Sequence, residues 1–87
     1  MAEYQILYWK DLPAQVRTRD GVTQVKKVLP ERFQQAIDAR AMLENSTDEE
    51  SYLAGWRWSE WHARAGDSQT VLDQVVAELE AYLEPRH

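Results

Sequence analysis

The fold of this chain follows from the stretch Tyr8-Trp9-Lys10-Asp11-Leu12-Pro13-Ala14-Gln15-Val16, which joins the end of one expected strand to the start of the next. The run that leads into it, residues 4–9, is rich in aromatic and β-branched side chains, as strands are. Bulky residues would point to both faces, which predicts an inner strand covered on part of each side. Leu12 precedes Pro13 and is biased away from the helical region, and Pro13 has no backbone N–H to give to a sheet. The stretch is therefore predicted to form a corner between two strands.

A hairpin is expected directly after this corner. Asp20-Gly21 separates two strand-like runs, residues 16–19 and 22–28. The dipeptide suits a type I′ turn, in which both central residues have positive φ. Val16 and Val25 are expected to point inward. Together with the first strand, the hairpin makes a three-stranded antiparallel meander.

Helices are predicted to follow the meander. The first begins at Pro30-Glu31, because proline is tolerated in the first helical turn and glutamate suits the positive helix end. It stops near Asn45, which tolerates the left-handed conformation. A second helix is expected to start near Asp48 and to run to Ala65, with Gly66 ending it. The apolar stripe of the first helix consists of Phe33, Ala36, Ile37, Ala41 and Leu43.

A third helix, capped by Asp67 or Ser68, has the most regular amphipathic pattern in the chain. Its apolar stripe consists of Val71, Leu72, Val75, Val76, Leu79, Tyr82 and Leu83. The whole chain, residues 1–87, is therefore predicted to be a single α+β domain. In it, a small three-stranded antiparallel sheet is followed by three packed α-helices.

The charge of the chain is unevenly distributed. The net charge is −5, but residues 1–40 carry +2 and residues 41–87 carry −7. An acidic chain is a poor general binder of phosphate backbones, which disfavours nucleic acid as a partner. A local basic cluster in the hairpin is either a solvated face with lysines on an edge strand or a surface that meets an acidic partner or a nucleic acid strand. It consists of Arg17, Arg19, Lys26 and Lys27.

No catalytic, metal or cofactor signature is found. The chain has no cysteine, and its two histidines, His62 and the terminal His87, are not spaced to share a metal ion. The three glycines are isolated, so there is no glycine-rich phosphate loop. No run of apolar residues approaches the length of a membrane span, and no signal-peptide pattern opens the chain. A protein without cofactors, located in the cytoplasm and away from membranes, is the simplest expectation.

Several polar residues occupy unusual positions. Arg40 lies about 20° from Phe33 on a helical wheel, at the centre of an apolar stripe. Its guanidinium must reach solvent or pair with a carboxylate, and Asp11 is the partner we expect in such a structural ion pair. The corner and the first helix bring further polar groups among bulky ones. The candidates for partner binding there are Trp9, Lys10, Asp11, Gln15 and Arg32.

Tryptophans are the other candidates. On a second helix over residues 48–65, Trp56, Trp58 and Trp61 would point in different directions, so they cannot share one stripe. Either the helix lies between two layers, or Trp58 and Trp61 form an exposed patch of the kind that binds partners.

Three segments of the chain resemble the small bacterial virulence factor domain family. They are Tyr8-Trp9-Lys10-Asp11-Leu12-Pro13-Ala14-Gln15-Val16, Leu29-Pro30-Glu31-Arg32-Phe33-Gln34-Gln35-Ala36-Ile37-Asp38 and Tyr52-Leu53-Ala54-Gly55-Trp56. The family includes stand-alone proteins and the C-terminal module of a larger conserved virulence factor. The similarity covers the chain to about Trp56 and continues weakly into the last helix. The family name describes a phenotype rather than a reaction, so the resemblance implies no catalytic residues.

Two hypotheses about function follow. The first is a non-enzymatic protein-interaction module, or small accessory subunit of a larger complex, that offers the corner and Trp58/Trp61 to another protein. The second is a small-molecule-binding or catalytic domain. It would use Lys10, Asp11, Gln15, Arg32 and Arg40, and it requires a pocket in which these groups converge. A domain of 87 residues has little room for such a pocket, so the first hypothesis leads.

Overall fold

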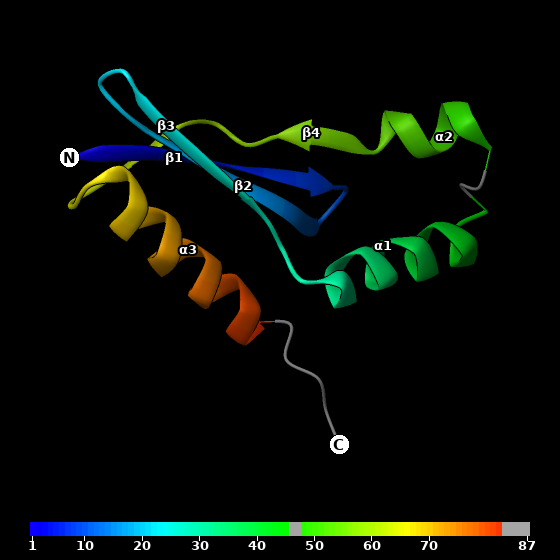
Figure 1. Ribbon diagram of the computed structural model, residues 1–87. Coiled ribbons are helices and arrows are strands. Elements are labelled where there is room, and N and C mark those ends of the chain that lie inside the picture. Colours follow the sequence, from blue (N-terminus) through cyan, green and yellow to red (C-terminus); the bar gives the residue numbers. More distant parts are fainter. Residues whose placement is uncertain (46–47, 83–87) are drawn as a thin grey trace.

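The computed structural model describes residues 1–45 and 48–82, with residue 82 described by its backbone only. Five strands and three helices follow one another along this part of the chain in the order β1-β2-β3-α1-α2-β4-β5-α3 (Figure 1). Their bounds are β1 Ala2–Trp9, β2 Leu12–Asp20, β3 Thr23–Val28, α1 Glu31–Leu43, α2 Glu49–Ala54, β4 Trp56–Trp58, β5 His62–Arg64 and α3 Ser68–Tyr82. The predicted α+β class is confirmed, but the sheet has five strands instead of three.

β1 is the central strand of an antiparallel sheet in the order β3-β2-β1-β4, with β5 also pairing with β1. One edge of β1 pairs with β2, so that Ile6 lies opposite Val16. The other edge pairs with β4 at one end, where Trp9 lies opposite Trp56, and with β5 at the other end, where Tyr4 lies opposite His62. The prediction of an inner first strand is confirmed.

The predicted long second helix is wrong. α2 ends at Ala54, and the chain then returns along β1 as β4 and β5. Without these two short strands, the backbone N–H and C=O groups on one edge of β1 would lack partners, which is costly wherever they are buried. The alternation of aromatic and polar residues at 56–58 fits a strand, and the helical reading assigned it the wrong period.

The two hairpin turns are tight. Between β2 and β3, Asp20 pairs with Thr23, so the turn residues are Gly21 and Val22 rather than Asp20 and Gly21. Gly21 has φ of 63°, whereas Val22 has no positive φ, which matches a type II′ turn and not the predicted type I′. At the corner between β1 and β2, the chain turns through Lys10, whose φ is 55°.

Two clusters of buried side chains hold the layers together. The larger one lies between α3 and the sheet and includes Val16, with Val25 packed against it, as predicted. Its buried members are Ala2, Ile6, Val16, Leu29, Phe33, Val71, Leu72, Val75 and Val76. Tyr82 and Leu83, which we placed on the α3 stripe, lie outside the described side chains.

The smaller cluster lies at the corner end of the strands, where α1 and α2 meet the sheet (Figure 1). Trp9 is fully buried against Ile37 and Ala41, and its indole N–H donates a hydrogen bond of 2.7 Å to the carbonyl of Tyr52. Leu43, assigned to the α1 stripe, is instead 82% exposed. Asn45 has φ of 56° directly after α1, as expected for its end.

Gly55 is the position where any side chain would disturb this cluster. A Cβ atom there would lie 2.6 Å from Nε1 of Trp9. Since Trp9 is fully buried, we expect Gly55→Ala to lower the free energy of unfolding by about 1–3 kcal/mol and to change the near-UV circular dichroism of the tryptophans.

The control is Gly21→Ala, where the added Cβ meets nothing within 4 Å and only the positive φ is unfavourable. It should cost roughly 1–2 kcal/mol and leave the near-UV spectrum unchanged. A Gly55→Ala variant with the stability and near-UV spectrum of the wild type would contradict the packing described here. Urea denaturation and circular dichroism measure both quantities.

Candidate interaction surface

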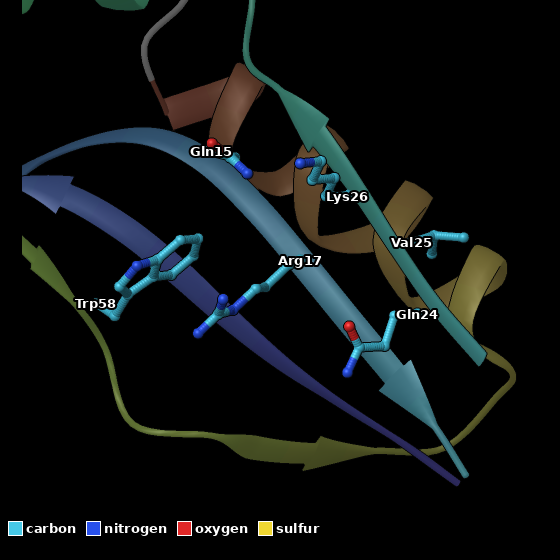
Figure 2. A pocket seen from close by; sticks show the side chains of 6 residues that line it. All are labelled: Gln15, Arg17, Gln24, Val25, Lys26 and Trp58. Carbon is cyan, nitrogen blue, oxygen red and sulfur yellow. The ribbon is translucent and has the colours of Figure 1, made fainter. Parts of the chain in front are cut away.

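The helix α3 covers one face of the sheet, and the described part of the chain leaves much of the opposite face uncovered. We call this uncovered surface the open face. Side chains alternate along each strand, so the residues that flank the buried Val16 and Thr18 point to it. Figure 2 looks onto this face, with α3 behind the strands. Its polar and aromatic residues are Gln5, Gln15, Arg17, Arg19, Gln24, Lys26, Trp58 and Trp61.

Two arginines of β2 stack on two tryptophans across this face. The guanidinium carbon of Arg17 lies 3.8 Å from the ring centroid of Trp58 and 5.3 Å from that of Trp61. The guanidinium carbon of Arg19 lies 3.8 Å from the Trp61 centroid. Such cation–π contacts contribute roughly 0.5–2 kcal/mol each, depending on exposure. Because Trp58 is still 37% exposed, the stack forms part of the molecular surface.

Hydrogen bonds fix the arginines in this position. Nε of Arg17 donates to Oε1 of Gln5 at 2.7 Å, and Nε2 of Gln5 donates to the carbonyl of Ser59 at 2.8 Å. Nε of Arg19 donates to the carboxylate of Glu3 at 2.9 Å. The segment that carries the tryptophans is thus attached to β1 and β2 by side chains as well as by backbone pairing.

A shallow hollow of about 360 Å³ lies beside the stack. Gln15 and Arg17 of β2 line it, together with Trp58 of β4 and Lys26 of β3 (Figure 2). Gln24 and Val25 complete its lining. The hollow therefore has cationic and amide groups with one aromatic wall, and none of its described lining residues carries a carboxylate.

The corner forms a separate cluster of ion pairs. Arg40 Nη1 lies 3.1 Å from Asp11 Oδ1 and 3.4 Å from Glu44 Oε2. Lys10 also pairs with Glu44, and its hydrogen bond is the main reason that the pKa of Glu44 lies below its usual range. These groups tie the turn between β1 and β2 to the end of α1. Surface ion pairs of this kind add little to stability individually.

The residues singled out in the sequence fall into different parts of the molecule. Trp9 is fully buried and serves the core. Asp11 lines a second hollow, of about 250 Å³, with Tyr8, Pro13 and Leu79, whereas Gln15 belongs to the open face. Arg32 reaches the carbonyl of Glu80 on α3 at 3.3 Å. The polar rim of Lys10, Asp11, Gln15 and Arg32 does not converge on one site.

Trp58 and Trp61 both lie beside Arg17, but Trp58 ends the short strand β4 and Trp61 lies in the connection to β5, not on a helix face. Sequence reasoning noted the basic cluster of the hairpin and missed that Arg17 and Arg19 stack on these tryptophans. The sequence shows that Arg17 and Arg19, two residues apart, share a strand face, but their contact with Trp58 and Trp61 depends on segments far apart in the sequence. Lys27, the neighbour of Lys26, points to the opposite face.

The described residues form neither a metal site nor a membrane-spanning helix. Within residues 1–45 and 48–82, no three His, Asp or Glu side chains are grouped so that they could hold a metal ion. His62 instead packs on the ring of Tyr4, with centroids 5.4 Å apart. None of the helices described is long and apolar enough to cross a membrane.

The stack leads to a prediction about stability. Replacing Arg17 by Gln removes the stacking on Trp58 and the hydrogen bond to Gln5, and we expect a loss of about 1–2 kcal/mol. Lys26→Gln, at the position directly opposite on β3, is the matched control, and its effect should lie within about 0.5 kcal/mol of zero. Urea denaturation followed by tryptophan fluorescence measures both. Equal effects of the two substitutions would show that the stack does not stabilise the fold.

The corner leads to a prediction about pH. The pKa of Glu44 is lowered in the folded state, so its contribution to stability is present above the unfolded-state value, about 4.3, and is lost as the pH falls through the folded-state value. We expect wild type to exceed Glu44→Gln in stability near neutral pH and the difference to vanish toward pH 3. Glu60→Gln is the control for the loss of a surface carboxylate, because Glu60 makes no ion pair among the described residues. A Glu44→Gln difference that is independent of pH would argue against the Lys10–Glu44 contact.

Comparison with known proteins gives one match. A family model described as virulence factor matches residues 7–86, which is nearly the whole chain. No curated protein and no solved structure matches. The matched range includes the corner, Trp58, Trp61 and α3, so it extends well past Trp56.

Proposed function

The chain belongs to the virulence factor family, and we propose that it is a non-enzymatic interaction module that binds a protein partner through its open face. The observation that carries this proposal is the exposed stack of Arg17 and Arg19 on Trp58 and Trp61. Tryptophan and arginine are the residues most enriched where protein interfaces derive their affinity.

The rigidity of this surface supports the proposal. Arg17 and Arg19 are long side chains that would lose conformational entropy on binding if they were free. Here their positions are already fixed by the indole rings and by hydrogen bonds to Gln5 and Glu3. A partner that binds such an ordered surface therefore restricts little further side-chain motion, so less conformational entropy is lost on binding.

The alternative corner site receives less support from the geometry. A small-molecule or catalytic site needs its polar groups in one concave place. Gln15 and Asp11 line different hollows, and Arg40 is engaged by Asp11 and Glu44. The corner groups Asp11, Arg40 and Glu44 therefore serve to hold the β1–β2 turn against the end of α1.

Site-specific photo-crosslinking tests the interaction proposal. A photoreactive amino acid is placed at Gln15, on the open face, and in a second variant at Ala77, exposed on the outer side of α3. In cells that make the protein natively, we expect one discrete adduct from position 15 and none from position 77. Adding Trp58→Ala to the position 15 variant should remove the adduct.

Circular dichroism confirms that each variant is folded. An adduct from position 77 alone, or no adduct from either position, would overturn the assignment of the open face as the binding surface.

A further inference from the structure

The outer edge of β3 has no partner strand in the described part of the chain. β3 ends the strand order, and its residues are exposed except for the half-buried Val25. An exposed edge strand offers backbone N–H and C=O groups to an added strand. β3 is six residues long, about the average for a strand, so the available edge is of ordinary size.

The register of the hairpin shows which backbone groups face this edge. Antiparallel pairs alternate between hydrogen-bonded and non-bonded types. The N–H of Leu29 donates to the carbonyl of Ala14 at 3.0 Å, and counting back by twos places Lys27, Val25 and Thr23 in bonded pairs with β2. The backbone groups that point outward are then those of Gln24, Lys26 and Val28, whose side chains lie on the open face.

Two cations stand directly opposite each other beside this edge. Arg17 of β2 and Lys26 of β3 form a cross-strand pair on the open face. Like charges in this position are unfavourable. Arg19 forms an ion pair with the carboxylate of Glu3. Among residues 1–45 and 48–82, neither Arg17 nor Lys26 lies within ion-pair distance of a carboxylate. The side chain of Arg17 bonds instead to the neutral amide of Gln5.

An anion in the neighbouring hollow would balance the charges of these two cations. The hollow is lined by both cations and by the amides of Gln15 and Gln24, which can donate further hydrogen bonds (Figure 2). Strands in a sheet are about 4.8 Å apart, so a glutamate on a strand added beside β3 can extend over β3 toward this hollow.

We propose that the partner contributes an extended acidic segment, which pairs with the free edge of β3 and places acidic side chains in the hollow beside Lys26 and Arg17. This inference rests on the proposed function and specifies the partner chemistry of the same open face. Backbone pairing supplies affinity, and alternate carboxylates supply specificity, because every second residue of the added strand points to the open face.

Other occupants fit less well. A nucleic acid strand would need free ring faces for base stacking and many phosphate contacts. One face each of Trp58 and Trp61 is covered by a guanidinium, and the chain carries a net charge of −5. A second copy pairing through β3 would bring the cations Lys26 and Lys27 of both copies together, which disfavours that contact.

A random 12-residue peptide library displayed on phage tests the proposal with the full chain as bait. We expect enriched peptides to carry Asp or Glu at alternate positions and to lack proline between them. A selected peptide, made synthetically, should shift the backbone amide signals of Gln24, Lys26 and Val28 in NMR spectra, and its affinity should fall at least tenfold in 0.5 M salt.

Lys26→Glu and Lys27→Glu are matched variants, with the same charge change at adjacent positions that point to opposite faces. Lys26→Glu should weaken binding of the selected peptide at least tenfold, and Lys27→Glu should change it less than threefold. Arg17→Gln provides a second test with a smaller change of charge. Enrichment of basic, apolar or proline-rich peptides, or equal effects of the two lysine variants, would overturn the proposal.

A twelve-nucleotide single-stranded DNA is tested in parallel. Tighter binding of this DNA than of any selected peptide, with loss in Lys26→Glu, would replace the acidic segment by a nucleic acid strand. The photo-crosslinking at Gln15 is independent of these measurements. An adduct there without any acidic peptide binding would remove only the chemistry inferred here and leave the interaction module standing.

Discussion

The burial of Trp9 is the constraint on which the rest of the structure depends. Its indole is fully buried, and its N–H is satisfied by the carbonyl of Tyr52, so α2 must stand close to the end of β1. Gly55 then passes directly against the ring, where no side chain fits, and its carbonyl accepts the N–H of Lys10 at 2.8 Å. From that point the chain can only return along β1, and Trp56 pairs opposite Trp9. One buried ring thus determines where α2 ends and where β4 begins.

The elements that local chemistry specifies could be predicted from the sequence. The turn between β1 and β2, the hairpin around Gly21 and the start of α1 after Pro30 each depend on a few neighbouring residues, although Pro13 itself lies within β2 and the turn is made at Lys10. α3 was predicted because its apolar residues recur with a helical period over four turns. β4 and β5 are three residues long, too short to establish a period, and the reason for their pairing lies in β1, far away in sequence. The helical reading of residues 55–65 failed for that reason.

The same limit applied to the open face. The basic residues of the hairpin and the two tryptophans were each visible as unusual, yet their contact depends on strand pairing across more than forty residues. Gln5 and Ser59, which lock the segment in place, are separated by 54 positions. The corner was easier to foresee, because the need of Arg40 for a carboxylate can be read from its place on the α1 stripe, and Asp11 lies 3.1 Å from it. A charged residue on an apolar helix stripe can be recognised from its near neighbours in the sequence. Stacking between side chains of different strands cannot, because it depends on how distant segments pair.

The division of β1 between two sets of partners has a consequence for the order of folding. Its pairing with β2 closes a short loop, whereas its pairing with β4 and β5 closes loops of roughly fifty residues, which costs more entropy and slows formation. On a ribosome the hairpins are complete long before residues 56–64 emerge. The stack of Arg17 and Arg19 on the two tryptophans exists only after residues 56–64 have docked on β1. A nascent or truncated chain that ends before residue 56 lacks the stack, so the open face distinguishes a chain in which this long-range pairing has formed.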